Sequence, residues 1–250
     1  MKTILEVNNV CKSFGNTQVL HDITFKVEEG EFIAIMGQSG SGKSTLLYGI
    51  SGMDRLTSGS VLFCGEDISR LDDKAMSEIR LNQMGFVFQH SYLLKNLSIR
   101  DNIVLPGFKA GVISRQQINK NADGLMNRTG IYGVASNDIK KVSGGELQRA
   151  AICRALINEP DILFGDEPTG ALNSSTTREV MDIINNVNAD GTTVIIVTHD
   201  AKAAARASRV IYLMDGNIHA ELTLGKYEGD EKTKIYRQNM LSDWLHEQGF

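Results

Sequence analysis

The sequence predicts an α/β fold in which parallel strands are covered by helices. Three apolar runs typical of buried strands occur along the chain, at residues 32–35, 162–164 and 194–197. A segment of helical length follows Gly42, and another covers about residues 174–188. Because parallel strands are joined through crossover helices, this alternation predicts a parallel sheet with helices on its faces.

The remaining elements follow from local patterns. Residues 4–35 are strand-like, and the alternation of apolar and polar side chains from Val19 to Val27 predicts a strand with one buried face. A further strand pair is predicted at residues 61–63 and 86–88.

The pattern is helical from about residue 91 to 158. Ser114 and Gln117 have the spacing of a capping box. The apolar face of the helix that they begin consists of Ile118, Ala122, Leu125 and Met126.

The composition excludes several classes of protein. The 250 residues are 42% hydrophobic and 22% charged, which excludes collagen-like and disordered chains. No window approaches the roughly 20 apolar residues of a membrane-spanning helix, and the N-terminus lacks the apolar core of a secretory signal. Three widely spaced cysteines favour reduced thiols, to which we assign no role. A net charge of −4 disfavours a nucleic-acid partner, so we expect a soluble cytosolic protein.

Residues 37–44 read Gly-Gln-Ser-Gly-Ser-Gly-Lys-Ser, which matches the phosphate-binding pattern G-x-x-x-x-G-K-[ST] between a strand and a helix. Glycines let backbone N–H groups converge on phosphate oxygens, and the helix N-terminus adds positive charge. We expect Lys43 to contact the β- and γ-phosphates and Ser44 to hold Mg²⁺. The alternative, a simple glycine- and serine-rich turn, is disfavoured because the pattern arises by chance in about 1 chain in 100.

A second predicted strand ends in two acidic residues. Asp166 ends the run at 162–166, and Glu167 follows it. A phosphate-binding loop requires a carboxylate on a neighbouring strand for its metal, so we expect Asp166 to hold Mg²⁺, usually through water. Glu167 would face the γ-phosphate and polarise the attacking water. The alternative, an acidic surface turn before Pro168, is disfavoured by the buried-type strand that leads into it.

Residues 142–149 read Val-Ser-Gly-Gly-Glu-Leu-Gln-Arg. Ser143 and Glu146 alone predict a helix N-terminus closed by a capping box. The segment also resembles the signature of ATP-binding-cassette (ABC) ATPases, usually Leu-Ser-Gly-Gly-Gln.

Three further motifs of the ABC family occur in order. Gln89 follows a strand as the Q-loop does, residues 171–173 occupy the D-loop position, and His199 matches the switch histidine. The resemblance covers about residues 3–222. It implies a P-loop NTPase fold of the ABC nucleotide-binding type, with a small antiparallel β-subdomain and an inserted α-helical subdomain.

The resemblance also implies domain boundaries. The ABC ATPase domain would cover residues 1–224, with its helical subdomain at about 91–158. Residues 225–250 would form a C-terminal tail. Within it, residues 233–248 predict an amphipathic helix whose apolar side chains are Tyr236, Met240, Leu241, Trp244 and Leu245. This helix could fold back on its own domain or contact a partner, and both alternatives stay open.

The resemblance implies ATP and Mg²⁺ as the ligands. In this family the signature of one subunit faces the ATP of the other, so the site requires a second copy of the chain. Residues expected to contact nucleotide are Phe14, Gly37, Gln38, Ser39, Gly40, Ser41, Gly42, Lys43, Ser44, Thr45 and, toward the partner's ATP, Ser143, Gly144, Gly145 and Glu146. The expected catalytic residues are Lys43, Gln89, Glu167 and His199, and the expected Mg²⁺ site is Ser44, Gln89 and Asp166.

At three of these positions the sequence departs from the usual pattern of the family. Phe14 would stack on adenine where the family often has Tyr, and its alternative is a core phenylalanine. Glu146 replaces the usual Gln of the signature but still serves a capping box. Asn173 replaces the common Asp of the D-loop, which leaves communication between the two ATP sites open.

Three stretches resemble the MacB/LolD class of ABC ATPases, namely residues 86–94, 102–106 and 165–172. That class pairs with membrane permeases, and the resemblance places the docking site near Gln89 and residues 92–106. The extended C-terminus is similar to BceA-type ATPases of peptide-antibiotic resistance. Alternatives are lipoprotein release, cell-division mechanotransmission, a soluble ABC machine and a non-enzymatic interaction module. The expected location is the cytoplasmic face of the cell membrane, peripheral through the permease.

Overall fold

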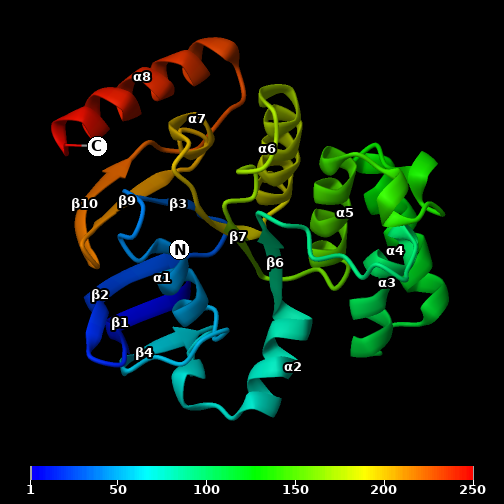
Figure 1. Ribbon diagram of the computed structural model, residues 1–250, viewed down its shortest axis with the longest axis horizontal. Coiled ribbons are helices and arrows are strands. Elements are labelled where there is room, and N and C mark those ends of the chain that lie inside the picture. Colours follow the sequence, from blue (N-terminus) through cyan, green and yellow to red (C-terminus); the bar gives the residue numbers. More distant parts are fainter. Residues whose placement is uncertain (1, 250) are drawn as a thin grey trace. The chain divides into compact units, whose positions relative to one another are not determined.

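The computed structural model describes residues 2–249 (Figure 1). The chain divides into two compact units. One comprises the chain up to Met76 together with the chain from Val187 onward, and the other is Ser77–Asn186.

An antiparallel sheet of order β2-β1-β4-β5 forms one part of the first unit. In β2, buried Leu20, Ile23, Phe25 and Val27 alternate with exposed polar residues beyond Asp22, which confirms the expected one-sided strand. The strands are β1 (Thr3–Phe14), β2 (Thr17–Glu28), β4 (Ser58–Phe63) and β5 (Glu66–Asp67), and a short 3₁₀ turn η1 (Ile68–Arg70) follows.

The first unit also contains a parallel set of strands. β3 (Phe32–Met36) lies between β8 (Thr193–Val197) and β9 (Arg209–Met214) and is parallel to both, and β10 (Asn217–Thr223) is antiparallel to β9. Every residue of β3 and β8 is buried, as expected for strands covered on both faces. The helices of this unit are α1 (Lys43–Ile50), α7 (Ala201–Ala204) and α8 (Glu231–Glu247).

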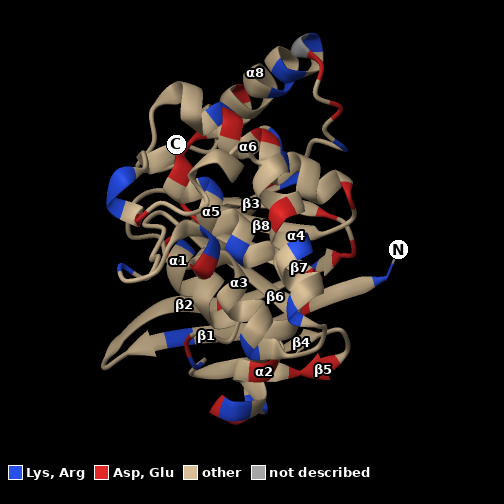
Figure 2. Cartoon of the chain, turned by 90° about the vertical axis from the view of Figure 1, so that its right-hand side faces the viewer, with Lys and Arg blue, Asp and Glu red and all other residues tan. Residues whose placement is uncertain are grey.

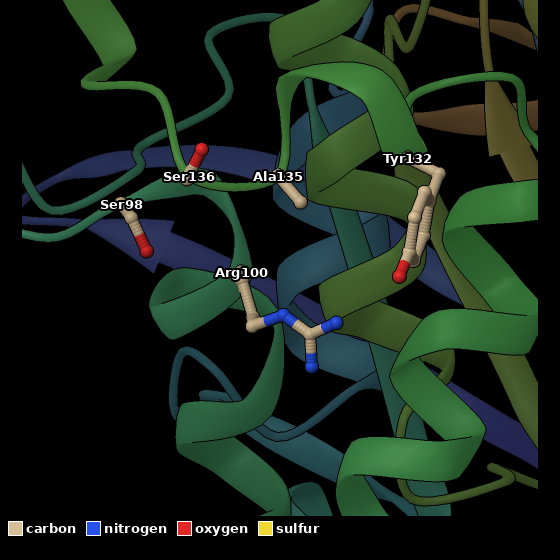
Figure 3. A pocket seen from close by; sticks show the side chains of 5 residues that line it. All are labelled: Ser98, Arg100, Tyr132, Ala135 and Ser136. Atoms are coloured by element: carbon tan, nitrogen blue, oxygen red, sulfur yellow. The ribbon is translucent and has the colours of Figure 1, made fainter.

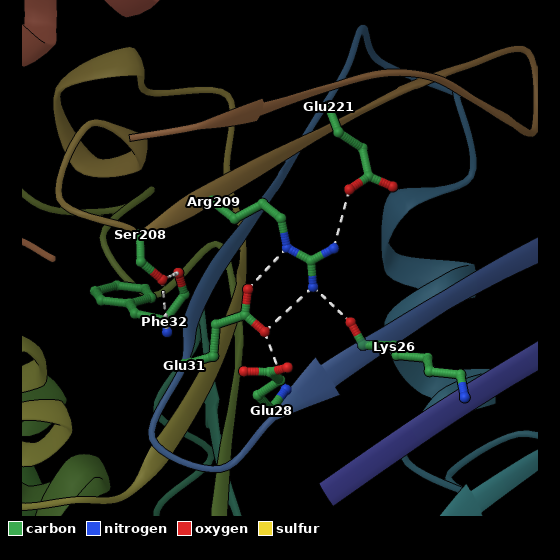
Figure 4. A network of polar contacts seen from close by, with 7 residues as sticks. All are labelled: Lys26, Glu28, Glu31, Phe32, Ser208, Arg209 and Glu221. Carbon is green, nitrogen blue, oxygen red and sulfur yellow. Dashed lines mark hydrogen bonds and ion pairs between the residues drawn. The ribbon is translucent and has the colours of Figure 1, made fainter. Parts of the chain in front are cut away.

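Arg209 ties the strands of the first unit together (Figure 4). Its guanidinium donates to Glu31 at 2.7 Å, to Glu221 at 2.9 Å and to the backbone carbonyl of Lys26. Burial acts to lower the pKa of Arg209, but the hydrogen bonds and charges of Glu31 and Glu221 outweigh it and raise the pKa. One cation therefore joins β2, β9, β10 and the turn before β3.

The second unit contains two parallel strands and a group of helices. β6 (Met84–Phe88) pairs with β7 (Ile162–Asp166), with Phe88 opposite Asp166. The strands predicted at 61–63 and 86–88 are both present, within β4 and β6, but each of them pairs with another strand. Residues 61–63 lie in β4, which pairs antiparallel with β1, whereas β6 joins a parallel ladder in which both strand faces are covered.

Helices α3, α4 and α5 share an apolar core that includes Ile103, Ile118, Met126 and Cys153. The predicted apolar face of α4 is confirmed, but the capping box is half formed. Ser114 accepts from the backbone N–H of Gln117, whose side chain donates instead to Asn121 at 2.7 Å. The helices are α2 (Asp73–Gln83), which begins in the first unit, α3 (Ile99–Ala110), α4 (Arg115–Arg128), α5 (Gly144–Leu156) and α6 (Ser174–Ala189), with 3₁₀ turns η2 (Tyr132–Val134) and η3 (Ile139–Lys141).

The C-terminal helix α8 packs with one face against the rest of its own unit. Arg237, Leu241 and Leu245 are buried at four-residue spacing, and Trp244 lies edge-on to Tyr212 with ring centroids 6.3 Å apart. Tyr236, predicted on this apolar face, is instead 67% exposed. The buried position in this turn is instead Arg237, which donates to backbone carbonyls.

Charged side chains of both signs are interspersed along the helices and strands (Figure 2). Over residues 2–249, the helices are too short or too polar for any of them to span a membrane.

Candidate nucleotide site

The phosphate loop, residues 37–45, leaves β3 and begins α1. A Cβ on Gly37 would lie 2.2 Å from the carbonyl oxygen of Leu213, so only glycine fits. Gly42 has φ +97°, and a Cβ there would lie 2.9 Å from Leu20. Lys43 folds back over the loop, and its Nζ donates to the carbonyls of Gly37 at 2.9 Å and Gln38 at 2.8 Å.

The donors of this loop suit an anionic ligand. Ser41 is 5% exposed, and within residues 2–249 its hydroxyl has no hydrogen-bond partner. A buried hydroxyl left unpaired costs about 1–3 kcal/mol, and a ligand oxygen in the loop would supply the missing partner. With the Lys43 ammonium and the N-terminus of α1, the loop has the chemistry of a phosphate site.

His199 lies at the same sheet edge as the phosphate loop within the first unit. β8 is parallel to β3 and next to it, so the residues that follow both strands leave at the same edge. The segment is held on both sides of His199. The Thr198 N–H donates to the Ile35 carbonyl at 3.1 Å, and Asp200 caps α7 by accepting from the Lys202 N–H at 2.8 Å.

Phe14 is a surface residue. It ends β1, its ring is 54% exposed, and the Lys12 ammonium lies 4.7 Å from the ring centroid. The alternative of a core phenylalanine is therefore wrong, and an exposed ring of this kind suits stacking on a planar ligand.

In the second unit, Gln89, Asp166 and Glu167 come together. Because Phe88 pairs with Asp166, the next residue on each strand leaves the ladder at the same edge. A Cβ on Gly170 would lie 3.1 Å from Gln89 Nε2, which places the Gln89 side chain against this turn. Glu167 has φ +48°, a left-handed conformation that is uncommon outside glycine. Strain of this kind persists where the surrounding structure fixes it, often at functional sites.

The signature segment forms the N-terminus of α5, and its capping box is confirmed. The Ser143 hydroxyl accepts from the Glu146 N–H at 3.3 Å, and the Glu146 carboxylate accepts from the Ser143 N–H at 2.7 Å. The bonds that this carboxylate accepts from the Ser143 N–H and from the Ser143 hydroxyl lower the pKa of Glu146. Ser143 and Gly144 are exposed, so this helix N-terminus is presented at the surface.

The Asn173 substitution leaves the D-loop capped. Its side-chain oxygen accepts from the Thr176 N–H at 3.0 Å and from the Ser175 hydroxyl at 2.8 Å, at the start of α6. An Asp at this position would accept the same bonds, so the change removes a charge without removing the cap.

Gln148 was missed in the sequence. It is buried in α5, and its side-chain amide donates to the carbonyl of Phe88, just before Gln89, and to that of Pro168, just after Glu167. The one feature of the sequence that could have indicated its role is that a polar residue occupies a position on the buried face of a helix.

A separate pocket of about 370 Å³ lies in the second unit (Figure 3). Two of its residues, Ser98 and Arg100, belong to the stretch expected to dock a permease. The Arg100 guanidinium is paired with Asp123. The pocket is lined by Ser98, Arg100, Tyr132, Ala135 and Ser136.

The phosphate loop, the paired strand-end acids and the exposed signature helix together define an ABC cassette. A family model described as ABC transporter matches residues 20–170, and the chain belongs to this family. It is an ATP-binding ABC ATPase.

Individual relatives extend the likeness over nearly the whole chain. The bacitracin export ATP-binding protein BceA of Halalkalibacterium halodurans is 39% identical, over 98% of this chain and 96% of its own length. The lipoprotein-releasing system ATP-binding protein LolD of Leptospira interrogans is 38% identical, over 92% and 95%. The macrolide export ATP-binding/permease protein MacB of Psychrobacter arcticus is 39% identical over 91% of this chain, which spans only 35% of that protein.

Solved structures share the fold. The ATP-binding cassette MJ0796, in a dimeric post-hydrolysis state with ADP and Pi, superposes with a TM-score of 0.82 at 36% identity, covering 90% of this chain and all of that one. A second dimeric structure of the same cassette gives a TM-score of 0.83 at 37% identity. The ABC cassette fold expected from the sequence is thereby confirmed.

Proposed function

We propose that this chain is the ATPase subunit of a MacB/BceA-type transporter involved in peptide-antibiotic resistance or sensing. The main support is the similarity to a bacitracin export subunit, which extends over 98% of the chain, whereas the similarity to the LolD relative extends over 92%. Lipoprotein release is the second candidate, because LolD is similar at almost the same identity.

The test is deletion of the gene from its source organism. We expect the deletion strain to become more sensitive to bacitracin, and the wild-type gene to restore growth where a Glu167→Gln gene does not. Unchanged bacitracin sensitivity together with mislocalised lipoproteins would support the second candidate instead.

We propose roles for the individual residues by their match to the family motifs. Lys43 and the phosphate loop bind the β- and γ-phosphates of ATP, and Phe14 stacks on adenine. Mg²⁺, when bound, supplies positive charge beside these phosphates, and Ser44, Gln89 and Asp166 would hold it.

Two residues are proposed to act on the reacting atoms. Glu167 accepts the proton of the attacking water, and His199 contacts the γ-phosphate.

Glu167→Gln tests the proposed base. The amide cannot take a proton but keeps the shape of the side chain, so we expect ATP affinity to stay within about threefold while phosphate release falls at least 100-fold. Nucleotide binding and phosphate release measured on the same preparation decide the matter. Rapid hydrolysis by the variant would remove Glu167 from this role.

The proposed partners are a second copy of the chain and a membrane permease. Dimeric structures of a related cassette support the first. The permease would dock near Gln89 and residues 92–106, where Tyr92, Leu94 and Leu105 are exposed apolar side chains. Bound to such a permease, the chain would lie peripherally at the cytoplasmic face of the membrane.

Leu94→Ser tests the docking stretch. Loss of an exposed apolar contact should reduce co-purification with the permease while leaving basal ATP hydrolysis within about twofold. Val112→Ser is the matched control, because Val112 is also exposed and apolar but lies outside the stretch. Equal loss of the permease in both variants would contradict the assignment.

A further inference from the structure

Gln148 joins the end of β6 to the turn after β7 through a single buried amide group. It lies in the second turn of α5 and is 3% exposed. Its Nε2 donates to the carbonyl oxygens of Phe88 at 2.8 Å and Pro168 at 2.7 Å. Two carbonyl acceptors fix the orientation of the amide, because only its nitrogen can donate, and they use both of its N–H groups.

Both carbonyls lie next to proposed catalytic groups, one at the end of β6 and the other in the turn after β7. Phe88 immediately precedes Gln89, and Pro168 immediately follows Glu167. The two loops leave the paired strands β6 and β7 at the same edge. One side chain therefore fixes the spacing between these loops.

The surroundings make this spacing sensitive to displacement. The Gln89 side chain packs against Gly170, where even an added Cβ would lie 3.1 Å from it. Glu167 is held in a left-handed conformation, and the turn after it is closed by the Gly170 N–H donating to the Glu167 carbonyl at 2.9 Å. A left-handed Glu requires support from its neighbours, and Gln148 bonds the carbonyl one residue away.

The same helix also carries the signature segment. Ser143 at the start of α5 is five residues before Gln148, about 7.5 Å along a helix axis. Farther along α5, Arg154 donates to the carbonyls of Ser91 and Tyr92, each at 2.8 Å. The end of β6 and the loop after it are therefore each attached to α5.

We propose that Gln148 is a positioning residue for ATP hydrolysis, which holds Gln89 and Glu167 in register and connects both to the signature on the same rigid helix. This inference rests on the proposed function, because it takes Gln89 and Glu167 as the groups that act on ATP. Movement of the signature helix against a partner's nucleotide would then be transmitted to the loop carrying Glu167.

Gln148→Met tests the inference, because methionine has a similar length and no donor. We expect kcat to fall by about 10- to 100-fold, since misplacement of reacting groups by about 1 Å has effects of this size. KM and the dissociation constant for ATP should stay within about threefold, because the phosphate loop is not touched. Gln148→Glu keeps the side-chain shape but places a carboxylate against two carbonyl oxygens. It should likewise lower kcat while leaving KM and the dissociation constant for ATP nearly unchanged.

Ile152→Val is the matched control for lost stability. Ile152 is fully buried in the same helix, and its truncation should lower the melting temperature while leaving kcat unchanged. Wild-type kcat in both Gln148 variants would overturn the inference, as would an equal loss of kcat in Ile152→Val. If Glu167→Gln hydrolyses ATP normally, the proposed function fails instead. If Glu167→Gln is inactive and the Gln148 variants are normal, only this inference fails.

Discussion

At the scale of single residues, polar side chains that bond backbone carbonyls and N–H groups shape the candidate site. Lys43 bonds two carbonyls of its own loop, and Asn173 caps α6. Glu146 stands in place of the usual Gln, and its carboxylate accepts hydrogen bonds from the N–H and the hydroxyl of Ser143. The departures from the family pattern at Glu146 and Asn173 therefore preserve local structure, because the replacing side chain keeps an acceptor at the same place.

Cys153 provides a prediction at this scale. Burial raises the pKa of its thiol to about 11, against a smaller opposing effect of its hydrogen bond with Thr129. At pH 8 only about one thousandth of such a thiol is thiolate, so Cys153 should resist iodoacetamide in the folded protein. Exposed Cys64 should be alkylated under the same conditions.

Mass spectrometry of the alkylated peptides gives the measurement. Labelling in denaturant provides the control, since both cysteines should then react. Equal labelling of Cys64 and Cys153 in the folded protein would show that Cys153 is accessible and contradict the packing of the helical core.

At the scale of elements, α8 is attached to the first unit by Arg237. The guanidinium donates to the carbonyls of Ala205 and Ala207, after α7, and to those of Leu224 and Gly225, after β10. Burial lowers the pKa of Arg237, but the carbonyls occupy its donors and compensate for lost water. The C-terminal helix therefore packs on its own unit, and one side chain joins it to the segment that follows His199.

Arg237→Met should destabilise the fold because it leaves buried carbonyls unpaired. We expect the free energy of unfolding to fall by about 3 kcal/mol, measured by denaturant titration. Tyr236→Ala is the control on the outer side of the same helix and should change the free energy by less than about 0.5 kcal/mol. Similar values for the two variants would mean that α8 is not held through its buried face.

Elements and motifs with strong local signals could be predicted from the sequence. The buried strands at 32–36, 162–166 and 193–197 follow from unbroken apolar runs, and the Ser143 capping box follows from residue types at fixed spacing. Helix α2 was missed because Met76 is its one buried residue, so its sequence lacks an apolar stripe.

Other features depend on tertiary contacts that local patterns do not report. The sequence of β4 does not specify which strand pairs with it, because that depends on how the whole sheet assembles. The buried Arg237 side chain bonds carbonyls that lie more than ten residues away in the sequence. The carbonyls that Gln148 bonds lie 60 and 20 residues away in the sequence. Such long-range polar contacts leave no periodic signal in the sequence.

At the scale of the whole molecule, the exposed signature is the feature that calls for a second copy of the chain. An N-terminus of α5 with exposed Ser143 and Gly144 presents N–H groups and positive dipole outward. On the proposed function, these groups meet the γ-phosphate of ATP bound by the partner. ATP would then join the two copies, and hydrolysis would release them.

The most direct test of this account is the mass of Glu167→Gln in solution with ATP and Mg²⁺, measured by light scattering after gel filtration. We expect a dimer in ATP, because the bound ATP is not consumed, and a monomer without nucleotide. Adding Ser143→Arg to Glu167→Gln should keep the chain monomeric while ATP still binds. A monomer in saturating ATP for Glu167→Gln alone, or a dimer that forms equally well with Ser143→Arg, would contradict the account.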